Sequence, residues 1–560
     1  MSDAALTVEA HIPAELASTV AEALARAGDQ RVAERVRPNG ERAADPTLWA
    51  PAGAPEVANR LGWLTIAERM LAQAEELRAF ADRVRDDGIR DVVVLGMGGS
   101  SLAPEVLRRS FAPEPGRPRL HVLDSTDAAE VRTVGGQVDP AHTLFLVSSK
   151  SGGTIEPLSL FAHFWSLIED GAHFAAITDP GSGLEKLAHE HGFREVFAGD
   201  PDIGGRYSAL SPFGMVPAAL AGIDIRPLLG GAAEAWQTAL SPNASELSAG
   251  SEQAGVWIGA ALSALSQAGH DKLTFVIGET LPGLGLWLEQ LVAESTGKQG
   301  TGILPVAEEP LGEPGDYGGD RVFAYLSDLD APDSELDARV RALADAGHPL
   351  LWVPTRGPSD LGRVFMLWEV AVAVAGWGLQ INPFDQPNVQ QAKDATKQVL
   401  ADYEAKGELE RAPEADDAAL AALLRAAAPP AYVALMGYVE PSPEFDAAVA
   451  ELRRAIRKGG SGGGRATTTF GYGPRFLHST GQFHKGGPKV GRFLQLLHDG
   501  PQDVEIPGAA YGFTTLKNAE AIGDFNTLRE LGLPAERVRL QGDDAAAALR
   551  ALTKQIEEAL

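Results

Sequence analysis

Residues 144–158 read LFLVSSKSGGTIEPL, and this stretch decides the fold class. Its apolar first half predicts a buried strand, and its last part resumes as a helix near Ile155. Gly152 and Gly153 allow the turn between strand and helix to wrap closely around a ligand. A strand, a turn and a helix in this order are typical of a parallel α/β sheet.

The turn in this stretch is rich in groups that bind phosphate. Three hydroxyl groups and one ammonium group converge there with the free N–H groups of a helix N-terminus, which suits a terminal phosphate. These groups belong to Ser149, Lys150, Ser151 and Thr154. A serine-capped helix start that binds no ligand is the alternative interpretation.

A second glycine-rich turn lies upstream, in the segment DVVVLGMGGSSL at residues 91–102. Gly99 and Ser100 of this turn also place backbone N–H groups and a helix N-terminus where an anion can bind. By itself the turn also fits a dinucleotide site, because Asp124 ends a later strand at a plausible distance. An oxidoreductase is therefore an open alternative at this point.

Apolar runs continue outward from these turns at intervals suited to parallel strands. They are LHVLD at 120–124, AAITD at 175–179, LTFVIGE at 273–279 and PLLWVPT at 349–355. The pattern predicts two α/β sandwich units, at residues 61–240 and 241–400. Residues 1–60 are expected to form a helical N-terminal extension packed on the first of these units, and residues 401–560 a C-terminal α/β region packed on the core. The apolar stretch 364–381 contains Glu369 and predicts a buried core helix, not a membrane span.

Composition narrows the classes of partner. The 560 residues carry 48 basic and 76 acidic side chains, a formal charge of −28, which repels nucleic acid and anionic lipid. The absence of cysteine excludes disulfides, thiolate catalysis and cysteine-bound zinc. The first twenty residues lack a basic start followed by an apolar run, so we expect no secretory signal and a cytoplasmic location.

Several further motifs join the two phosphate-binding turns in a recognisable order. They are GGRYS at 204–208, QLVAESTGK at 290–298, and NPFDQ at 382–386 with Lys393 seven residues beyond. Together these motifs resemble the glucose-6-phosphate isomerase family over about residues 60–400. The similarity is closest to the isomerase half of proteins in which transaldolase and isomerase are fused, and no transaldolase half is present.

The resemblance implies two sugar-isomerase-type (SIS) α/β/α sandwich domains with parallel-rich sheets. It implies reversible isomerisation of glucose 6-phosphate and fructose 6-phosphate, through ring opening and a cis-enediolate, in glycolysis and gluconeogenesis. The substrate is then a small sugar phosphate, no metal or cofactor is needed, and a homodimer is expected. A related isomerase acting on mannose 6-phosphate and a non-catalytic phosphosugar sensor are the alternatives.

The same resemblance suggests roles for individual residues. A carboxylate that moves a proton between neighbouring carbons needs a dry site, and the motif gives this role to Glu294. Arg206 has a charge that cannot titrate and would stabilise the enediolate oxygens. Lys393 and a histidine would open the ring. Neutral contacts to the substrate are expected from Gly205, Gln290 and Gln386.

The histidine is harder to assign. GEPGDYGGD at 312–320 resembles the family's approach to it but ends in Asp320, and the similar C-terminal segment, residues 473–500, follows the lysine motif instead of preceding it. If FLQLLHDG at 493–500 is aligned with the family's helix, Gly491 falls at the expected position. We therefore assign ring opening to His484, with His478 as the alternative, and expect residues 486–488 to end any helix there.

Overall fold

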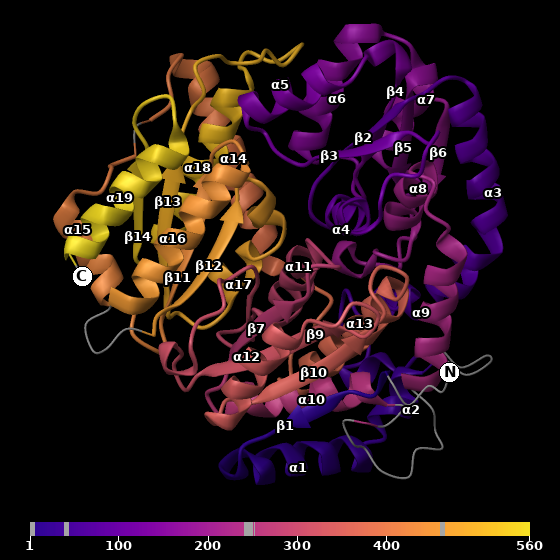
Figure 1. Ribbon diagram of the computed structural model, residues 1–560. Coiled ribbons are helices and arrows are strands. Elements are labelled where there is room, and N and C mark those ends of the chain that lie inside the picture. The colour runs from indigo at the N-terminus through magenta and orange to yellow at the C-terminus, as the bar shows by residue number, and fades with distance from the viewer. Residues whose placement is uncertain are drawn as a thin grey trace.

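The computed structural model describes residues 6–37, 44–239, 250, 253–410, 412–459 and 465–559. Residues 460–464 of the glycine-rich connection lie outside these ranges. The chain builds three sheets, which Figure 1 shows as an indigo-to-purple unit, a magenta-to-salmon unit and an orange-to-yellow unit. The prediction of an α/β protein with parallel-rich sheets is confirmed.

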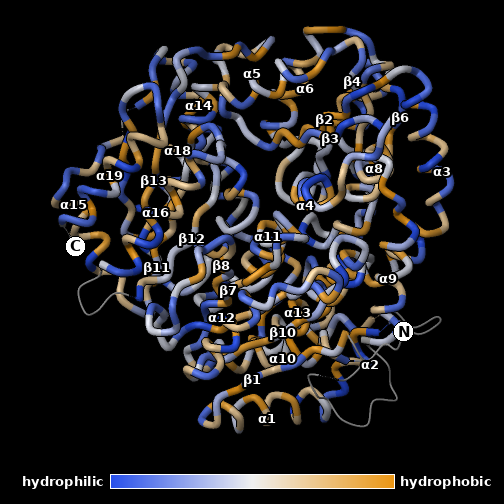
Figure 2. The backbone as a smooth tube through the Cα atoms, in the orientation of Figure 1, coloured by the Kyte–Doolittle hydropathy of each residue, from blue (hydrophilic) through white to orange (hydrophobic). Residues whose placement is uncertain are grey.

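The first sheet is wholly parallel, in the order β3-β2-β4-β5-β6. Its strands are β2 (Asp91–Gly96), β3 (Arg119–Leu123), β4 (Thr143–Ser148), β5 (Phe174–Thr178) and β6 (Glu195–Ala198). Strands β2 and β4 are buried along their whole length, because helices cover both faces. Figure 2 shows these central strands as hydrophobic segments inside a more polar shell.

Alternate residues of β2 belong to different cores. Val92 and Val94 pack with α3, α4 and α8, whereas Val93 and Leu95 pack with α5, α6 and α7. The helices of this unit are α3 (Ile66–Asp86), α4 (Leu102–Ser110), α5 (Ala128–Gln137), α6 (Ile155–Ile168), α7 (Gly183–Glu190), α8 (Pro212–Leu220) and α9 (Ile225–Ala239).

The second sheet has the order β1-β10-β9-β7-β8, and all its pairs are parallel except β1 with β10. Its strands are β1 (Glu9–His11), β7 (Lys272–Ile277), β8 (Leu304–Val306), β9 (Arg321–Asp328) and β10 (Leu350–Thr355). Strand β1 comes from the N-terminal extension, whose helix α1 (Ala14–Asp29) contacts α10. The extension, which continues through α2 (Val32–Val36), thus completes an edge of the second unit instead of packing only on the first.

Four helices cover the second sheet: α10 (Ala254–Gln267), α11 (Leu284–Thr296), α12 (Ser334–Asp345) and α13 (Leu361–Gly378). Among the described residues, one helical span, 357–378, is long and apolar enough to cross a membrane, but 94% of it is buried in the molecule. It packs against α9, α10 and α11. The prediction of a buried core helix in this stretch is confirmed.

The C-terminal region forms its own parallel sheet, in the order β12-β11-β13-β14. Its strands are β11 (Tyr432–Tyr438), β12 (Thr467–Tyr472), β13 (Gly491–Leu497) and β14 (Ala535–Arg539). The helices are α14 (Pro387–Lys406), α15 (Asp417–Arg425), α16 (Pro443–Gly459), α17 (Gly481–Gly486), α18 (Phe513–Glu530) and α19 (Ala545–Ala559). The alignment that made FLQLLHDG a helix is wrong, because this segment is strand β13 and pairs with both β11 and β14.

The third sheet packs directly on the second unit. Ala434 and Met436 of β11 share a core with Ala293 of α11 and with Leu304 and Val306 of β8. Three short 3-10 turns meet beside this contact: η5 (Gly98–Ser100), η8 (Gly205–Tyr207) and η10 (Arg475–His478). The three units therefore converge at the carboxyl ends of the strands of the first sheet. The domain boundaries near residues 60, 240 and 400 stay a prediction.

Candidate active site

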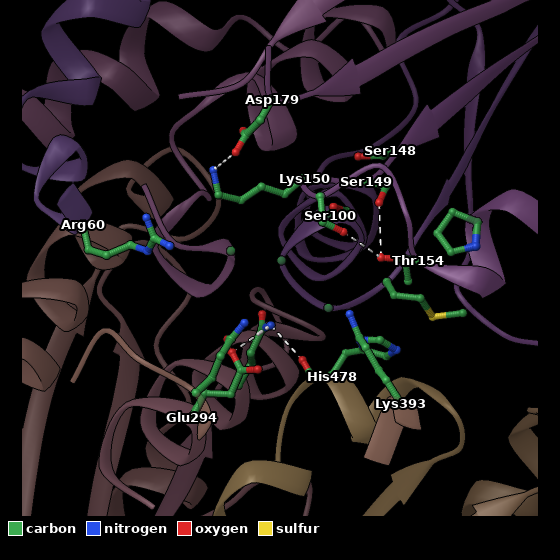
Figure 3. Close-up of a pocket in the computed structure, with 18 residues that line it drawn as sticks. Arg60, Ser100, Ser148, Ser149, Lys150, Thr154, Asp179, Glu294, Lys393 and His478 are labelled. Atoms are coloured by element: carbon green, nitrogen blue, oxygen red, sulfur yellow. Dashed lines mark hydrogen bonds and ion pairs between the residues drawn. The ribbon is translucent and has the colours of Figure 1, made fainter. Parts of the chain in front are cut away.

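A cavity of about 310 Å³ lies where the three units meet. Figure 3 shows Ser100, Ser149 and Thr154 along one side of it and Glu294, His478 and Lys393 along the other. Eleven of the thirteen residues that the sequence suggests for the site line this cavity, and the other two are Arg206 and His484. The eleven are Gly99, Ser100, Ser149, Lys150, Ser151, Thr154, Gly205, Gln290, Glu294, Gln386 and Lys393.

The hydroxyl-rich turn is held at the N-terminus of α6. The Ser149 hydroxyl donates to Thr154 Oγ1 at 3.3 Å and accepts from the Gly152 N–H at 3.2 Å. Thr154 is the residue before the first turn of α6, and its side chain caps none of the helix N–H groups. The helix dipole and uncapped N–H groups therefore face the cavity with three hydroxyl groups, an arrangement that suits an anion.

Lys150 points away from this turn. Its Nζ lies 2.5 Å from Asp179 Oδ2 and donates to the Asp200 carbonyl at 2.8 Å, and Figure 3 shows its side chain extended toward Asp179. Lys150 lines the cavity, but its charge is paired with a carboxylate in this state. Burial raises the pKa of Asp179, and Lys150 opposes that rise.

Two glycines bring the turns η5 and η8 into backbone contact. A Cβ added to Gly99 would lie 2.1 Å from the Gly205 carbonyl oxygen, so only glycine fits at position 99. Ser208 strengthens this contact by donating to the Gly99 carbonyl at 3.2 Å. The close approach places Arg206, the residue after Gly205, beside α11.

Glu294 and Arg206 form a buried pair at the second-unit side of the cavity. Arg206 Nη1 donates to Glu294 Oε2 at 3.3 Å, and Arg206 and Glu294 are only 2% and 4% exposed. Burial raises the pKa of Glu294, and Arg206, His478 and Lys298 hold that rise back. A buried carboxylate with a raised pKa is suited to accept a proton from carbon.

Arg206 itself lies behind the cavity wall. Its guanidinium donates to Gln386 Oε1 at 3.1 Å, to the Pro383 carbonyl at 3.0 Å and to the Asp385 carbonyl at 2.7 Å. These bonds fix it to the segment 382–386. The amide of Gln290 donates to Glu294 Oε2 at 3.4 Å. Glu294 thus receives hydrogen bonds from two predicted site residues.

His478 reaches the cavity from the third unit. Its Nε2 lies 2.7 Å from Glu156 Oε1, and its backbone carbonyl accepts from Gln290 Nε2 at 2.8 Å. Burial acts to raise the pKa of Glu156, but His478 and Lys393 outweigh it and lower that pKa. An ionised carboxylate bonded to one ring nitrogen favours a proton on that nitrogen.

The structure does not bring His484 to the cavity. His484 lies in the short helix α17, where its Nδ1 lies 2.9 Å from the Tyr432 hydroxyl. Burial and the neighbouring Lys485 lower the pKa of His484 to about 3, so its ring stays neutral. The preference for His484 is therefore corrected in favour of the alternative, His478. Helix α17 ends at Gly486, as the Gly-Gly-Pro sequence predicts.

Three cavity residues escaped the sequence analysis: Arg60, Glu156 and Asp179. Glu156 directly follows the phosphate turn, so a carboxylate two residues beyond Thr154 was a usable signal. Arg60 lies in an irregular segment and pairs with Glu56 at 2.9 Å, a contact that no motif announces. Asp179 ends strand β5, and its place beside Lys150 depends on strand order.

Asp124, the residue that supported a dinucleotide site, is fully buried and accepts two hydrogen bonds from Arg475, at 2.8 and 2.6 Å. Its carboxylate is thus engaged by a guanidinium and does not line the cavity. In the part of the chain that the structure describes, no group of three or more histidine, aspartate or glutamate side chains is arranged to hold a metal ion.

Comparisons with known proteins agree with this geometry. The family model for phosphoglucose isomerase matches residues 64–308. The glucose-6-phosphate isomerase of Rubrobacter xylanophilus is 31% identical over 369 residues, which cover 56% of this chain and 84% of that protein. A glucose-6-phosphate isomerase of Thermus thermophilus is 31% identical over 395 residues, which cover 62% of this chain and 91% of that protein.

Solved structures share the fold. A hypothetical protein of Thermus thermophilus superposes with a TM-score of 0.56 at 27% identity, covering 70% of this chain and all of that one. A glucose-6-phosphate isomerase from Chlamydia trachomatis gives a TM-score of 0.53 at 20% identity, covering 70% of this chain and 86% of that one. The predicted pair of sugar-isomerase-type sandwiches is confirmed. With these sequence matches, the chain belongs to the glucose-6-phosphate isomerase family.

Proposed function

We propose that this chain catalyses the reversible isomerisation of glucose 6-phosphate and fructose 6-phosphate, as the names of its relatives indicate. The observation that carries the proposal is the buried Glu294–Arg206 pair, which lies in a cavity whose far side is an anion-binding turn. A phosphate at one end of a short sugar would leave its C1 and C2 atoms at the other end, near the carboxylate.

The phosphate turn would anchor the substrate. The N–H groups at the start of α6 and the hydroxyls of Ser149, Ser151 and Thr154 would bind the phosphate oxygens. The Lys150 ammonium would add a charge if it turned from Asp179 toward the anion. Binding energy from the phosphate then holds the reacting carbons in place.

Ring opening would use His478 and Lys393, which lie together on one side of the cavity. One group removes the proton of the anomeric hydroxyl, and the other gives a proton to the ring oxygen as the C1–O5 bond breaks. Glu156 would hold the proton of His478 on Nε2 and orient the ring.

The isomerisation itself would use Glu294. Its carboxylate removes the proton from C2 of the open aldose and returns it to C1, so that an enediolate forms and collapses to the ketose. Arg206 keeps a positive charge beside that carboxylate at every pH of interest. The free Oε1 of Gln290 can accept a hydroxyl of the sugar.

We further propose a cytoplasmic enzyme that acts on free sugar phosphates, without nucleic acid or membrane as partners, and forms a homodimer. The formal charge of −28 supports the first part of this proposal. Light scattering after gel filtration would measure the oligomeric state.

The deciding experiment is a coupled assay of the purified chain with fructose 6-phosphate, in which glucose 6-phosphate is detected by its oxidation. Mannose 6-phosphate is offered in parallel. Turnover of fructose 6-phosphate is expected. Preference for mannose 6-phosphate would assign a related isomerase, and binding without turnover of either sugar would assign a sensor.

A further inference from the structure

The segment 382–386 joins α13 to α14 and is called here the Gln386 loop. It has no regular secondary structure, yet it holds Arg206 through two backbone carbonyls and carries the Gln386 side chain. Its position therefore decides where the guanidinium and the amide lie relative to Glu294.

Lys298 is bonded to this loop more closely than any sequence motif suggests. It lies just beyond the C-terminus of α11, four residues after Glu294, and is 2% exposed. Its Nζ donates to the Asn382 carbonyl and to the Asp385 carbonyl, both at 2.6 Å, and lies 2.7 Å from Asp385 Oδ1. One ammonium group thus bonds both ends of a four-residue stretch.

Lys298 and Arg206 share an acceptor. The Asp385 carbonyl accepts from Lys298 Nζ at 2.6 Å and from Arg206 Nη2 at 2.7 Å. The two cations are brought together only because this carbonyl and the Asp385 carboxylate lie between them. A cation without that carboxylate would repel the guanidinium, so the arrangement depends on the loop as much as the loop depends on it.

We propose that Lys298 is a positioning residue, whose ammonium group clamps the Gln386 loop so that the loop holds Arg206 against Glu294. This inference rests on the proposed isomerase function. Lys298 does not line the cavity and touches no reacting atom there. Its effect on the reaction passes through the loop and Arg206.

The clamp depends on the charge of Lys298, and its surroundings make that charge labile. The charged groups that face it are Arg206 from η8, Glu294 from α11 and Asp385 from the loop. Helix α17 contributes the uncharged Gln482 and Phe483, which contact Gly297. Burial and Arg206 lower the pKa of Lys298 to about 7, against the opposing pull of Asp385 and Glu294. The clamp is therefore expected to loosen on the alkaline side of neutrality.

The first test compares pH profiles of kcat and KM for the wild type, Lys298→Met and Lys298→Arg with fructose 6-phosphate. Lys298→Met should lower kcat about 100-fold, the cost of a misplacement of about 1 Å, while KM changes about 3-fold or less because the phosphate turn is intact. Lys298→Arg should recover part of kcat and lose the decline of wild-type activity near pH 7, since guanidinium does not titrate there.

Lys272→Met is the matched control. Lys272 is 1% exposed and pairs with Asp271 and Asp320 at the amino end of β7, away from the cavity. Its removal should lower thermal stability but leave the shape of the pH profile unchanged. Wild-type kcat and an unaltered pH profile in Lys298→Met would overturn the proposal.

A measurement without turnover separates this inference from the function. In the full chain labelled with ¹³C at lysine Cε, one resonance should titrate with a midpoint near 7 and be absent from Lys298→Arg. If the wild type fails to isomerise any sugar phosphate, the proposed function falls while this titration still tests the clamp. If no such resonance exists, or if it persists in Lys298→Arg, the clamp is refuted even where the enzyme is active.

Discussion

Arg206 Nη1 lies 3.3 Å from Glu294 Oε2, and this single contact joins a turn of the first unit to a helix of the second. Both groups are removed from water, so their mutual attraction is stronger than that of a surface pair. The pair keeps Glu294 available as a base while burial raises its pKa. Two predictions concern this pair and the histidine opposite it.

Glu294→Gln should abolish most turnover. An amide cannot accept a proton from carbon, so kcat is expected to fall by a factor of about 10⁴, while the affinity for fructose 6-phosphate changes little. Steady-state kinetics and calorimetric binding measure the two effects. Glu289→Gln is the control, because Glu289 is a buried carboxyl on the same helix that does not line the cavity. Undiminished turnover in Glu294→Gln would remove the assignment of the base.

His478→Asn should slow ring opening, because it removes a group that can exchange protons 2.7 Å from Glu156. The expected loss in kcat is about 100-fold. His484→Asn removes a buried histidine of the same region, and we expect it to lower stability more than turnover. Rapid mixing with freshly dissolved crystalline sugar phosphate, which is ring-closed, measures the step. If His484→Asn is the slower variant, the structural reassignment is wrong.

The parts of the site that the sequence predicted are those written in short contiguous motifs. Ser149 to Thr154 follow one another in a strand–turn–helix, and Gln290 and Glu294 lie one helical turn apart, so local geometry suffices to place them. Arg206 required the resemblance to a family as well, because its partner Glu294 is 88 residues away.

The histidine could not be placed by such reasoning. His478 lies 322 residues from Glu156 and in a different sheet unit, so only the packing of the third unit brings them together. The run FLQLL is short and apolar, and periodicity alone cannot decide between a helix and a strand for it. Pairing with β11 and β14 decides for the strand. That tertiary pairing also removed the reference point from which His484 was chosen.

Gly99→Ala should disrupt the site more than its size suggests. The added Cβ would lie 2.1 Å from the Gly205 carbonyl oxygen, a backbone atom that cannot move without shifting η8 and Arg206. We expect a loss of about 3 kcal/mol in the free energy of unfolding, or a large fall in kcat if the turn shifts instead. Urea denaturation and kinetics distinguish the two outcomes.

Gly205→Ala provides the matched comparison for the same contact. A Cβ at position 205 meets only the Gly99 Cα, at 4.0 Å, so the fold should tolerate it. Its free energy of unfolding is expected to stay within about 1 kcal/mol of the wild type. Equal destabilisation by both substitutions would show that the close approach of η5 and η8 is not the cause.

Glu289 predicts how stability depends on pH. Burial raises its pKa from 4.5 to about 8, and its Oε1 accepts the Ala307 N–H at 3.1 Å. The folded chain therefore binds this proton more tightly than the unfolded chain. The resulting stability is fully present below pH 4.5 and is lost as the pH rises through 8.

Glu289→Gln keeps the acceptor oxygen and cannot ionise, so it should remove this loss. At pH 8.5 we expect the variant to unfold with a free energy at least about 1 kcal/mol above that of the wild type, whereas at pH 5 the two should nearly coincide. Urea denaturation at both pH values measures the difference. Glu335→Gln, at an exposed position in α12, should shift neither value. A variant that gains as much at pH 5 as at pH 8.5 would show that packing, and not the ionisation of Glu289, sets the effect.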